Sequence, residues 1–190
     1  MKSVGAAVIF TDDFTNQKPN WSFKSPSVGF LGELNNNVNV QSVSLNIDVP
    51  TTLTANLRFD LLGFRTLDGF NCCTDLLTFS VNGATALIGA YSDTPANNYL
   101  ISNPSGASVS QLWAGVAGFA DSTSGHRFEV PNVQLNTGTN TFTWSYSYLQ
   151  PFYDEAWGLD NVTIATVPEP STIPFLILAL PFLMLYRRRK

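Results

Sequence analysis

The chain offers few residues that could carry out acid–base or nucleophilic chemistry. Its sole histidine is His126, and no Gly-x-Ser-x-Gly nucleophile elbow occurs in the sequence, so a Ser-His-Asp triad lacks its usual setting. We expect His126 to lie in a surface turn. Asp154 and Glu155 are neighbours and would face opposite sides of a strand, which makes them a poor acid and base pair. These patterns favour a protein that is not an enzyme.

The two cysteines of the chain, Cys72 and Cys73, are adjacent. A Cys/His zinc site would need more ligands, and His126 lies far away in the sequence. Three states therefore remain for the pair: a strained vicinal disulfide, a bond to another chain, or two thiols.

Aromatic side chains provide a different kind of chemistry. Trp113, Tyr153 and Trp157 follow or precede turn-forming segments. If they are exposed, their rings can stack on the apolar faces of sugar rings; the alternative is that they pack between sheets.

The elements that position these residues should be strands, because apolar residues recur at every second position of the chain. Leu53 to Leu61 and Phe142 to Tyr148 alternate between apolar and polar or small residues, as half-buried strands do. Val38 and Val40 precede a run in the opposite phase, which indicates a bulge near Gln41 or Ser42. The remaining predicted strands are 43–49, 76–81, 85–91, 112–119, 127–135 and 157–165.

Turn-forming residues separate these strands. Clusters of Asn, Asp, Gly, Pro and Ser lie at 35–37, 93–98 and 122–125, and Asn82-Gly83 is typical of a two-residue hairpin turn. About nine short strands with such turns predict an all-β fold, an antiparallel two-sheet β-sandwich of jelly-roll type. We assign this single domain to residues 11–166.

Charge argues against nucleic-acid binding. Four of the ten basic residues are the last four, so residues 1–166 hold six Lys and Arg residues against 13 Asp and Glu residues. A phosphate backbone would repel such a domain.

The C-terminal segment 173–186 is uncharged and is followed by Arg187, Arg188, Arg189 and Lys190. A 14-residue helix reaches roughly 21 Å, short of the roughly 30 Å hydrocarbon core of a bilayer. The basic cluster nevertheless predicts a transmembrane helix with a cytoplasmic C-terminus, because cations resist transfer into lipid and snorkelling can cover the mismatch. The alternative is a strand or helix of the soluble core.

Residues 167–190 resemble the PEP-CTERM sorting signal of exopolysaccharide-producing Gram-negative bacteria. The resemblance rests on Pro168-Glu169-Pro170, the single apolar segment and the terminal basic cluster, in that order at the C-terminus. It implies an exported protein that is held at the inner membrane until an exosortase processes it near the Pro-Glu-Pro motif, and that then reaches the cell surface or extracellular matrix. In that oxidising compartment a disulfide at Cys72 and Cys73 is favoured over thiols.

Export also requires an N-terminal signal. The apolar run Val4 to Phe10 is only seven residues long and leads directly into the expected first strand, so residues 1–10 are either a marginal signal or the remnant of one whose true start lies upstream of Met1. We favour the upstream start.

The stretch from Trp157 to Ile164 resembles the final strand of jelly-roll domains in PEP-CTERM and carbohydrate-binding proteins. That resemblance implies a structural calcium ion held by Asp160 together with Asp12 or Asp13, of which we select Asp13. Carboxylate oxygens suit calcium. The alternative is that Asp160 caps a turn.

The sequence thus predicts an exported envelope or matrix protein that is structural or binds polysaccharide. Its expected partners are an exosortase, the inner membrane and exopolysaccharide. The alternative is a secreted glycan-active hydrolase or lyase with a lectin-like sandwich fold.

Overall fold

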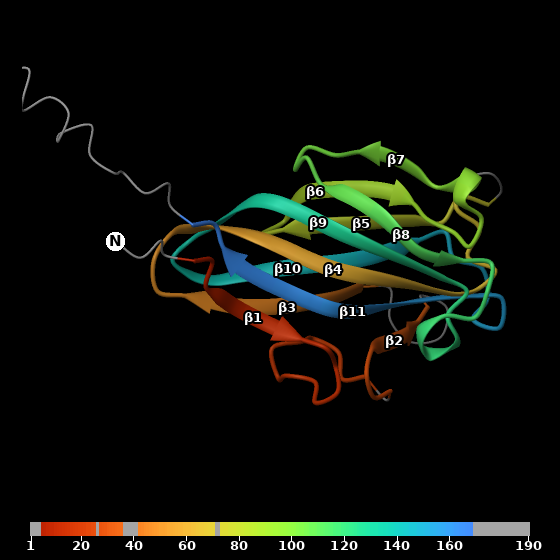
Figure 1. Ribbon diagram of the computed structural model, residues 1–190, viewed down its shortest axis with the longest axis horizontal. Coiled ribbons are helices and arrows are strands. Elements are labelled where there is room, and N and C mark those ends of the chain that lie inside the picture. The colour runs from red at the N-terminus through yellow and green to blue at the C-terminus, as the bar shows by residue number, and fades with distance from the viewer. Residues whose placement is uncertain (1–4, 26, 36–41, 71–72, 169–190) are drawn as a thin grey trace, which may run out of the picture.

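The computed structural model describes residues 5–25, 27–35, 42–70 and 73–168, and these residues form two sheets packed face to face (Figure 1). The strands are β1 (Val8–Asp12), β2 (Leu31–Leu34), β3 (Ser42–Val49), β4 (Leu53–Arg65), β5 (Leu76–Val81), β6 (Ala84–Ala90), β7 (Tyr99–Ser102), β8 (Ser108–Ala114), β9 (Ser124–Leu135), β10 (Gly138–Ser147) and β11 (Glu155–Thr166). Two short 3-10 turns, Pro95–Asn97 and Phe119–Asp121, lie in the connections.

All neighbouring strands pair antiparallel. One sheet has the order β1-β11-β4-β9-β8, with β2 also paired to β11, and the other has the order β3-β10-β5-β6-β7. The prediction of an all-β, antiparallel two-sheet sandwich is therefore confirmed.

The core lies between the sheets and follows from the alternation in the sequence. Phe59 of β4 and Phe128 of β9 stack with ring centroids 4.7 Å apart, and Phe59 meets the edge of Trp144 from the opposite sheet at 5.5 Å. Trp144 also packs against Phe79 of β5 at 5.0 Å. These rings are fully buried, so the inward-facing residues of both sheets form one continuous apolar layer.

The hairpin at Asn82-Gly83 is confirmed, since β5 pairs with β6 across it. Asn82 has φ of 50° and Gly83 has φ of 79°, the left-handed backbone that a two-residue turn of this type requires. The strands predicted at 76–81, 85–91, 127–135 and 157–165 lie within a few residues of β5, β6, β9 and β11. The bulge predicted near Gln41 or Ser42 falls at the edge of the described residues.

One strand prediction was wrong and two strands were missed. The strand placed at 112–119 ends at Ala114, because the Gly-rich stretch that follows forms a loop and a 3-10 turn. The strands β2 and β7 were missed. Each has only four residues, and the first three residues of β7 are exposed, so neither shows the alternation that identifies a strand.

The two ends of the domain lie side by side, because β1 pairs with β11 (Figure 1). Strand β1 already begins at Val8, and Phe10 is buried in the core, so part of the predicted 1–10 segment belongs to the sandwich. At the other end Val167 N donates to Thr54 O (3.0 Å) and Pro168 is exposed. The rest of the predicted sorting signal, with the transmembrane segment 173–186, lies outside the described residues. Within the described part of the chain no helix has the length and apolarity to cross a membrane.

Candidate carbohydrate-binding pocket

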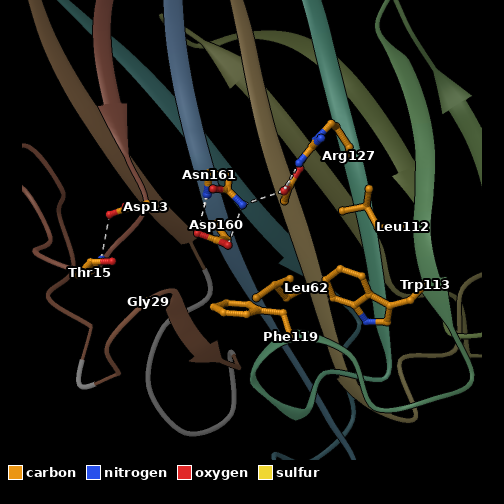
Figure 2. A pocket seen from close by; sticks show the side chains of 11 residues that line it. Asp13, Thr15, Gly29, Leu62, Leu112, Trp113, Phe119, Arg127, Asp160 and Asn161 are labelled. Atoms are coloured by element: carbon orange, nitrogen blue, oxygen red, sulfur yellow. Dashed lines mark hydrogen bonds and ion pairs between the residues drawn. The ribbon is translucent and has the colours of Figure 1, made fainter.

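An open pocket of about 560 Å³ lies on the outer face of the six-stranded sheet, away from the core (Figure 2). Strands β4, β9 and β11 form its floor, β8 lies at one side, and the connection after β1 lies at the other. Its lining consists of Asp13, Thr15, Gly29, Asp60, Leu62, Leu112, Trp113, Phe119, Arg127, Asp160 and Asn161.

A bulge in β11 supplies two adjacent polar residues to this pocket. The register between β11 and β4 shifts between Asp160 and Thr163, and Asn161 has φ of 50°. Leu159 and Val162 consequently both reach the core although three positions separate them, and Asp160 and Asn161 both line the pocket. β-Bulges often redirect side chains in this way next to functional sites.

A hydrogen-bonded row crosses the floor of the pocket. Arg127 of β9 binds both carboxylate oxygens of Asp60 of β4, each at 2.8 Å. Asn161 Nδ2 donates to Asp60 Oδ2 (3.0 Å) and to Asp160 Oδ2 (2.8 Å). The row is built because Asp160, Asp60 and Arg127 occupy paired positions on adjacent strands. Figure 2 shows these contacts as dashed lines.

The Asp160 carboxyl has an unusual affinity for protons. Its pKa is raised to about 6, mainly by burial; the charges of Asp60 and Asp13 also raise it, whereas the hydrogen bond from Asn161 N and the charge of Arg127 lower it. At pH 7 the pocket therefore holds three acidic groups and one guanidinium, an excess of negative charge.

Apolar side chains form the other half of the pocket. Leu112 and Phe119 are 38% and 45% exposed, and half-buried Trp113 lies beside them. The Trp113 ring approaches Gly118 and Gly125 so closely that a Cβ at either position would lie 2.1 Å or 2.6 Å from ring atoms. Trp113 Nε1 donates to Ser122 O (3.3 Å). Two backbone segments thus fix the orientation of the indole.

The structure brings two of the predicted calcium ligands into this pocket. Asp13 and Asp160 both line it, and the charge of Asp13 acts on Asp160. Asp12 instead organises the loop after β1, since it accepts hydrogen bonds from Phe14 N, Lys18 N and Trp21 Nε1. The other carboxylate of the pocket, Asp60, is already neutralised by Arg127. Calcium at Asp13 and Asp160 stays a prediction.

The three predicted stacking residues have different environments. Trp113 lines the pocket, and Tyr153 is 82% exposed in the β10–β11 connection, outside it. For Trp157 the role of stacking on a sugar is wrong and the alternative of packing between the sheets is right: its side chain is fully buried and packs on Tyr146 with ring centroids 5.4 Å apart. The reason is that Trp157 shares the inward face of β11 with Leu159, which the flanking turn residues did not reveal.

The prediction that His126 lies in a surface turn was wrong. It lies in β9 rather than in a turn, is 1% exposed, and accepts a hydrogen bond at Nε2 from Asn98 Nδ2 (2.9 Å). Burial lowers its pKa to about 4.

Asp154 and Glu155 do separate, since Asp154 accepts a hydrogen bond from Thr66 Oγ1 whereas Glu155 is buried. Cys72 lies outside the described residues, so the state of the cysteine pair stays a prediction.

Sequence reasoning missed Asp60, Arg127 and Asn161 as site residues. Asp60 takes an ordinary outward position between Phe59 and Leu61 of the core, so the alternation gave no signal that singled it out. Their assembly across three strands depends on register, which the sequence does not display.

No protein-family model and no characterised protein matches the sequence. Several solved structures are similar to it. A CBM35 from Cellvibrio japonicus Abf62 is 14% identical with a TM-score of 0.36, over 85% of this chain and 88% of the other. A family 35 carbohydrate binding module from Clostridium thermocellum is 13% identical with a TM-score of 0.33, over 84% and 95%.

A Podospora anserina GH26-CBM35 β-(1,4)-mannanase is 15% identical with a TM-score of 0.42 over 85% of this chain. This chain spans 28% of that mannanase chain and 22% of a ruminal GH26 endo-β-1,4-mannanase chain, about a quarter of each. Likenesses of this size do not assign a function to the chain.

Proposed function

We propose that the sandwich is a non-catalytic module that binds a neutral polysaccharide in the pocket on its six-stranded sheet. One observation carries the proposal: the pocket joins an apolar wall, formed by Trp113, Phe119 and Leu112, to a row of hydrogen-bonding groups. Sugar rings have the same division, with apolar C–H faces and hydroxyl edges. A volume of about 560 Å³ also lies in the range of ligand pockets.

The negative charge of the pocket favours neutral sugars over acidic ones. Asp13, Asp60 and Asp160 outnumber the single guanidinium of Arg127, so a polyuronate would meet repulsion, whereas neutral hydroxyl groups would find carboxylate acceptors. Arg127 uses two of its five donors on Asp60, which leaves donors for a ligand.

The same bonds argue against a hydrolase. An acid and base pair needs two carboxyl groups free to face the scissile bond. Both oxygens of Asp60 are bound to Arg127, and both oxygens of Asp160 accept hydrogen bonds from Asn161. The pocket is thus arranged for recognition.

Replacing Phe119 or Trp113 with alanine should weaken binding of neutral oligosaccharides at least about tenfold, since buried aromatic contacts at a binding site commonly supply more than about 1 kcal/mol. Isothermal titration with oligosaccharides from mannan, glucan and xylan measures this. The matched control is Tyr153→Ala, an exposed aromatic outside the pocket, which should bind as the parent does. Failure of the parent to bind any of them would overturn the proposal, as would release of new reducing ends.

We propose further that the C-terminal segment delivers this module. Strand β11 ends at Thr166, and Pro168 already lies exposed outside the sandwich, so a processing enzyme could reach Pro168, the first residue of the motif, without unfolding the domain. Glu169 is the only ionised side chain between Asp160 and Arg187, so it is the one charge in this stretch that a processing enzyme could recognise.

Glu169→Ala should leave export intact but make a full-length, membrane-bound form accumulate in a host that has an exosortase. Immunoblots of membrane and soluble fractions measure this. Neutral replacement of Arg187, Arg188 and Arg189 together should act earlier, because loss of the basic cluster lets unprocessed protein escape from the membrane. If Glu169→Ala is trimmed and released like the parent, the sorting role fails and the segment is at most an anchor.

A further inference from the structure

A second group of acidic side chains lies at one end of the sandwich, apart from the pocket. Asp68 and Asp75 belong to the connection between β4 and β5, and Glu155 is the first residue of β11. One carboxylate oxygen from each lies within 4.8 Å of the others. Asp75 and Glu155 are fully buried. The pairing of Glu155 with Arg65, the last residue of β4, brings these two connections together.

Each buried carboxylate accepts a hydrogen bond at one of its two oxygens, and this bond fixes its orientation. Asp68 N donates to Asp75 Oδ2 (2.9 Å), and Gln150 N donates to Glu155 Oε2. Gln150 Nε2 donates to Asp68 Oδ2 (3.3 Å), which links the β10–β11 connection to the β4–β5 connection. The opposite oxygens, Asp75 Oδ1 and Glu155 Oε1, are buried and accept no hydrogen bond from a described donor, and the two carboxyls lie close enough to hydrogen-bond to each other when one of them holds a proton.

Among the described residues, no basic side chain forms an ion pair with these acidic groups. The two ion pairs within the described ranges are Arg65 with Glu33 and Arg127 with Asp60. The buried Tyr146 hydroxyl also lacks a partner, and it lies near enough that the charges of Asp75 and Glu155 add to the effect of burial in raising its pKa. Buried carboxylate oxygens without a partner are costly, so the cluster in its ionised form requires a compensating cation.

We propose that Asp68, Asp75 and Glu155 bind a calcium ion that fastens the β4–β5 connection to the start of β11. The donor set consists of oxygen atoms only, as hard divalent cations prefer, and contains no His or Cys to favour zinc. Calcium suits the site better than magnesium, because it accepts irregular coordination and sheds water more readily, and neighbouring carbonyls and water can complete its six to eight ligands.

Calcium titration of the chelator-treated 190-residue chain tests the proposal. Calorimetry should show one calcium ion bound at this cluster. Calcium at about 100 times its Kd should raise the melting temperature of the chain by about 5 to 10 °C. Asp75→Asn and Glu155→Gln keep the shape of each side chain but remove its charge. Both should fold, melt at or above the temperature of the calcium-free parent, and lose the calcium response.

The matched control is Asp48→Asn, which removes a carboxylate of β3 that accepts a hydrogen bond from Thr139 Oγ1, lies outside both acidic clusters and should keep the calcium response. The proposal is overturned if calcium neither binds to the parent nor shifts its melting temperature, since Asp75 and Glu155 would then be sharing a proton. It is overturned equally if Asp160→Asn abolishes the response while Asp75→Asn and Glu155→Gln retain it, because the ion would then lie at Asp13 and Asp160. Sugar binding by the pocket does not depend on either result.

Discussion

Trp144→Ala is expected to remove about 3 to 5 kcal/mol from the free energy of unfolding. Trp144 is fully buried on β10, and its ring lies 5.0 Å from Phe79, 5.5 Å from Phe59 and 5.6 Å from Trp21. These contacts join both sheets to the loop after β1, so no single neighbour can move to fill the cavity. A domain of this size has about 5 to 15 kcal/mol in total, and the variant should therefore be close to unfolding at 37 °C.

Urea denaturation followed by tryptophan fluorescence measures the loss. Tyr153→Ala is the control, because it also deletes an aromatic ring but from a side chain that is 82% exposed, and it should change stability by less than about 0.5 kcal/mol. A loss of less than about 1 kcal/mol for Trp144→Ala would contradict the assignment of Trp144 to the centre of the core.

Stability in chelator is expected to fall as pH rises from about 4 to 7. Burial is the largest cause that raises the pKa of Asp75 to about 6, of Glu155 to about 7 and of Asp160 to about 6. Over this interval the folded state keeps protons on these carboxyls that the unfolded state has released, so each group makes folding less favourable as pH increases, by up to about 1.4 kcal/mol per pH unit.

His126 acts in the opposite direction. Burial lowers its pKa to about 4, so between about 4 and 6.5 the unfolded state binds the additional proton and stability rises with pH. Three carboxyls act against one imidazole, so the folded state holds the larger number of protons and stability should fall overall as pH rises.

Denaturation at pH 4.5, 6 and 7.5 in chelator measures this slope. Glu155→Gln and Asp160→Asn should each make the slope of stability against pH less steep, by the contribution of about one proton. Each substitution deletes one of the titrating groups. The assignment of buried, uncompensated carboxyls fails if the parent chain keeps constant stability, or gains stability, between pH 5 and 7.

The sequence alone determined the fold class. The alternation in Leu53 to Leu61 and Phe142 to Tyr148 requires one buried and one outward face per strand, and the Asn82-Gly83 turn requires left-handed backbone. Both signals are local, since they depend on residues within a few positions of each other. Asp160 was located as a candidate site residue by the resemblance of Trp157 to Ile164 to the final strand of jelly-roll domains.

Only the tertiary structure decided which residues meet. Asp60, Arg127 and Asp160 are up to 100 positions apart, and they form one row because β4, β9 and β11 are neighbours in a particular register, interrupted by a bulge at Asn161. Register is set by the packing of whole faces, and a one-residue shift would have turned Asp60 into the core. Asp68, Asp75 and Glu155 likewise meet through the pairing of β4 with β11, and Trp157 is buried rather than available to a sugar because its face of β11 closes the core against Tyr146.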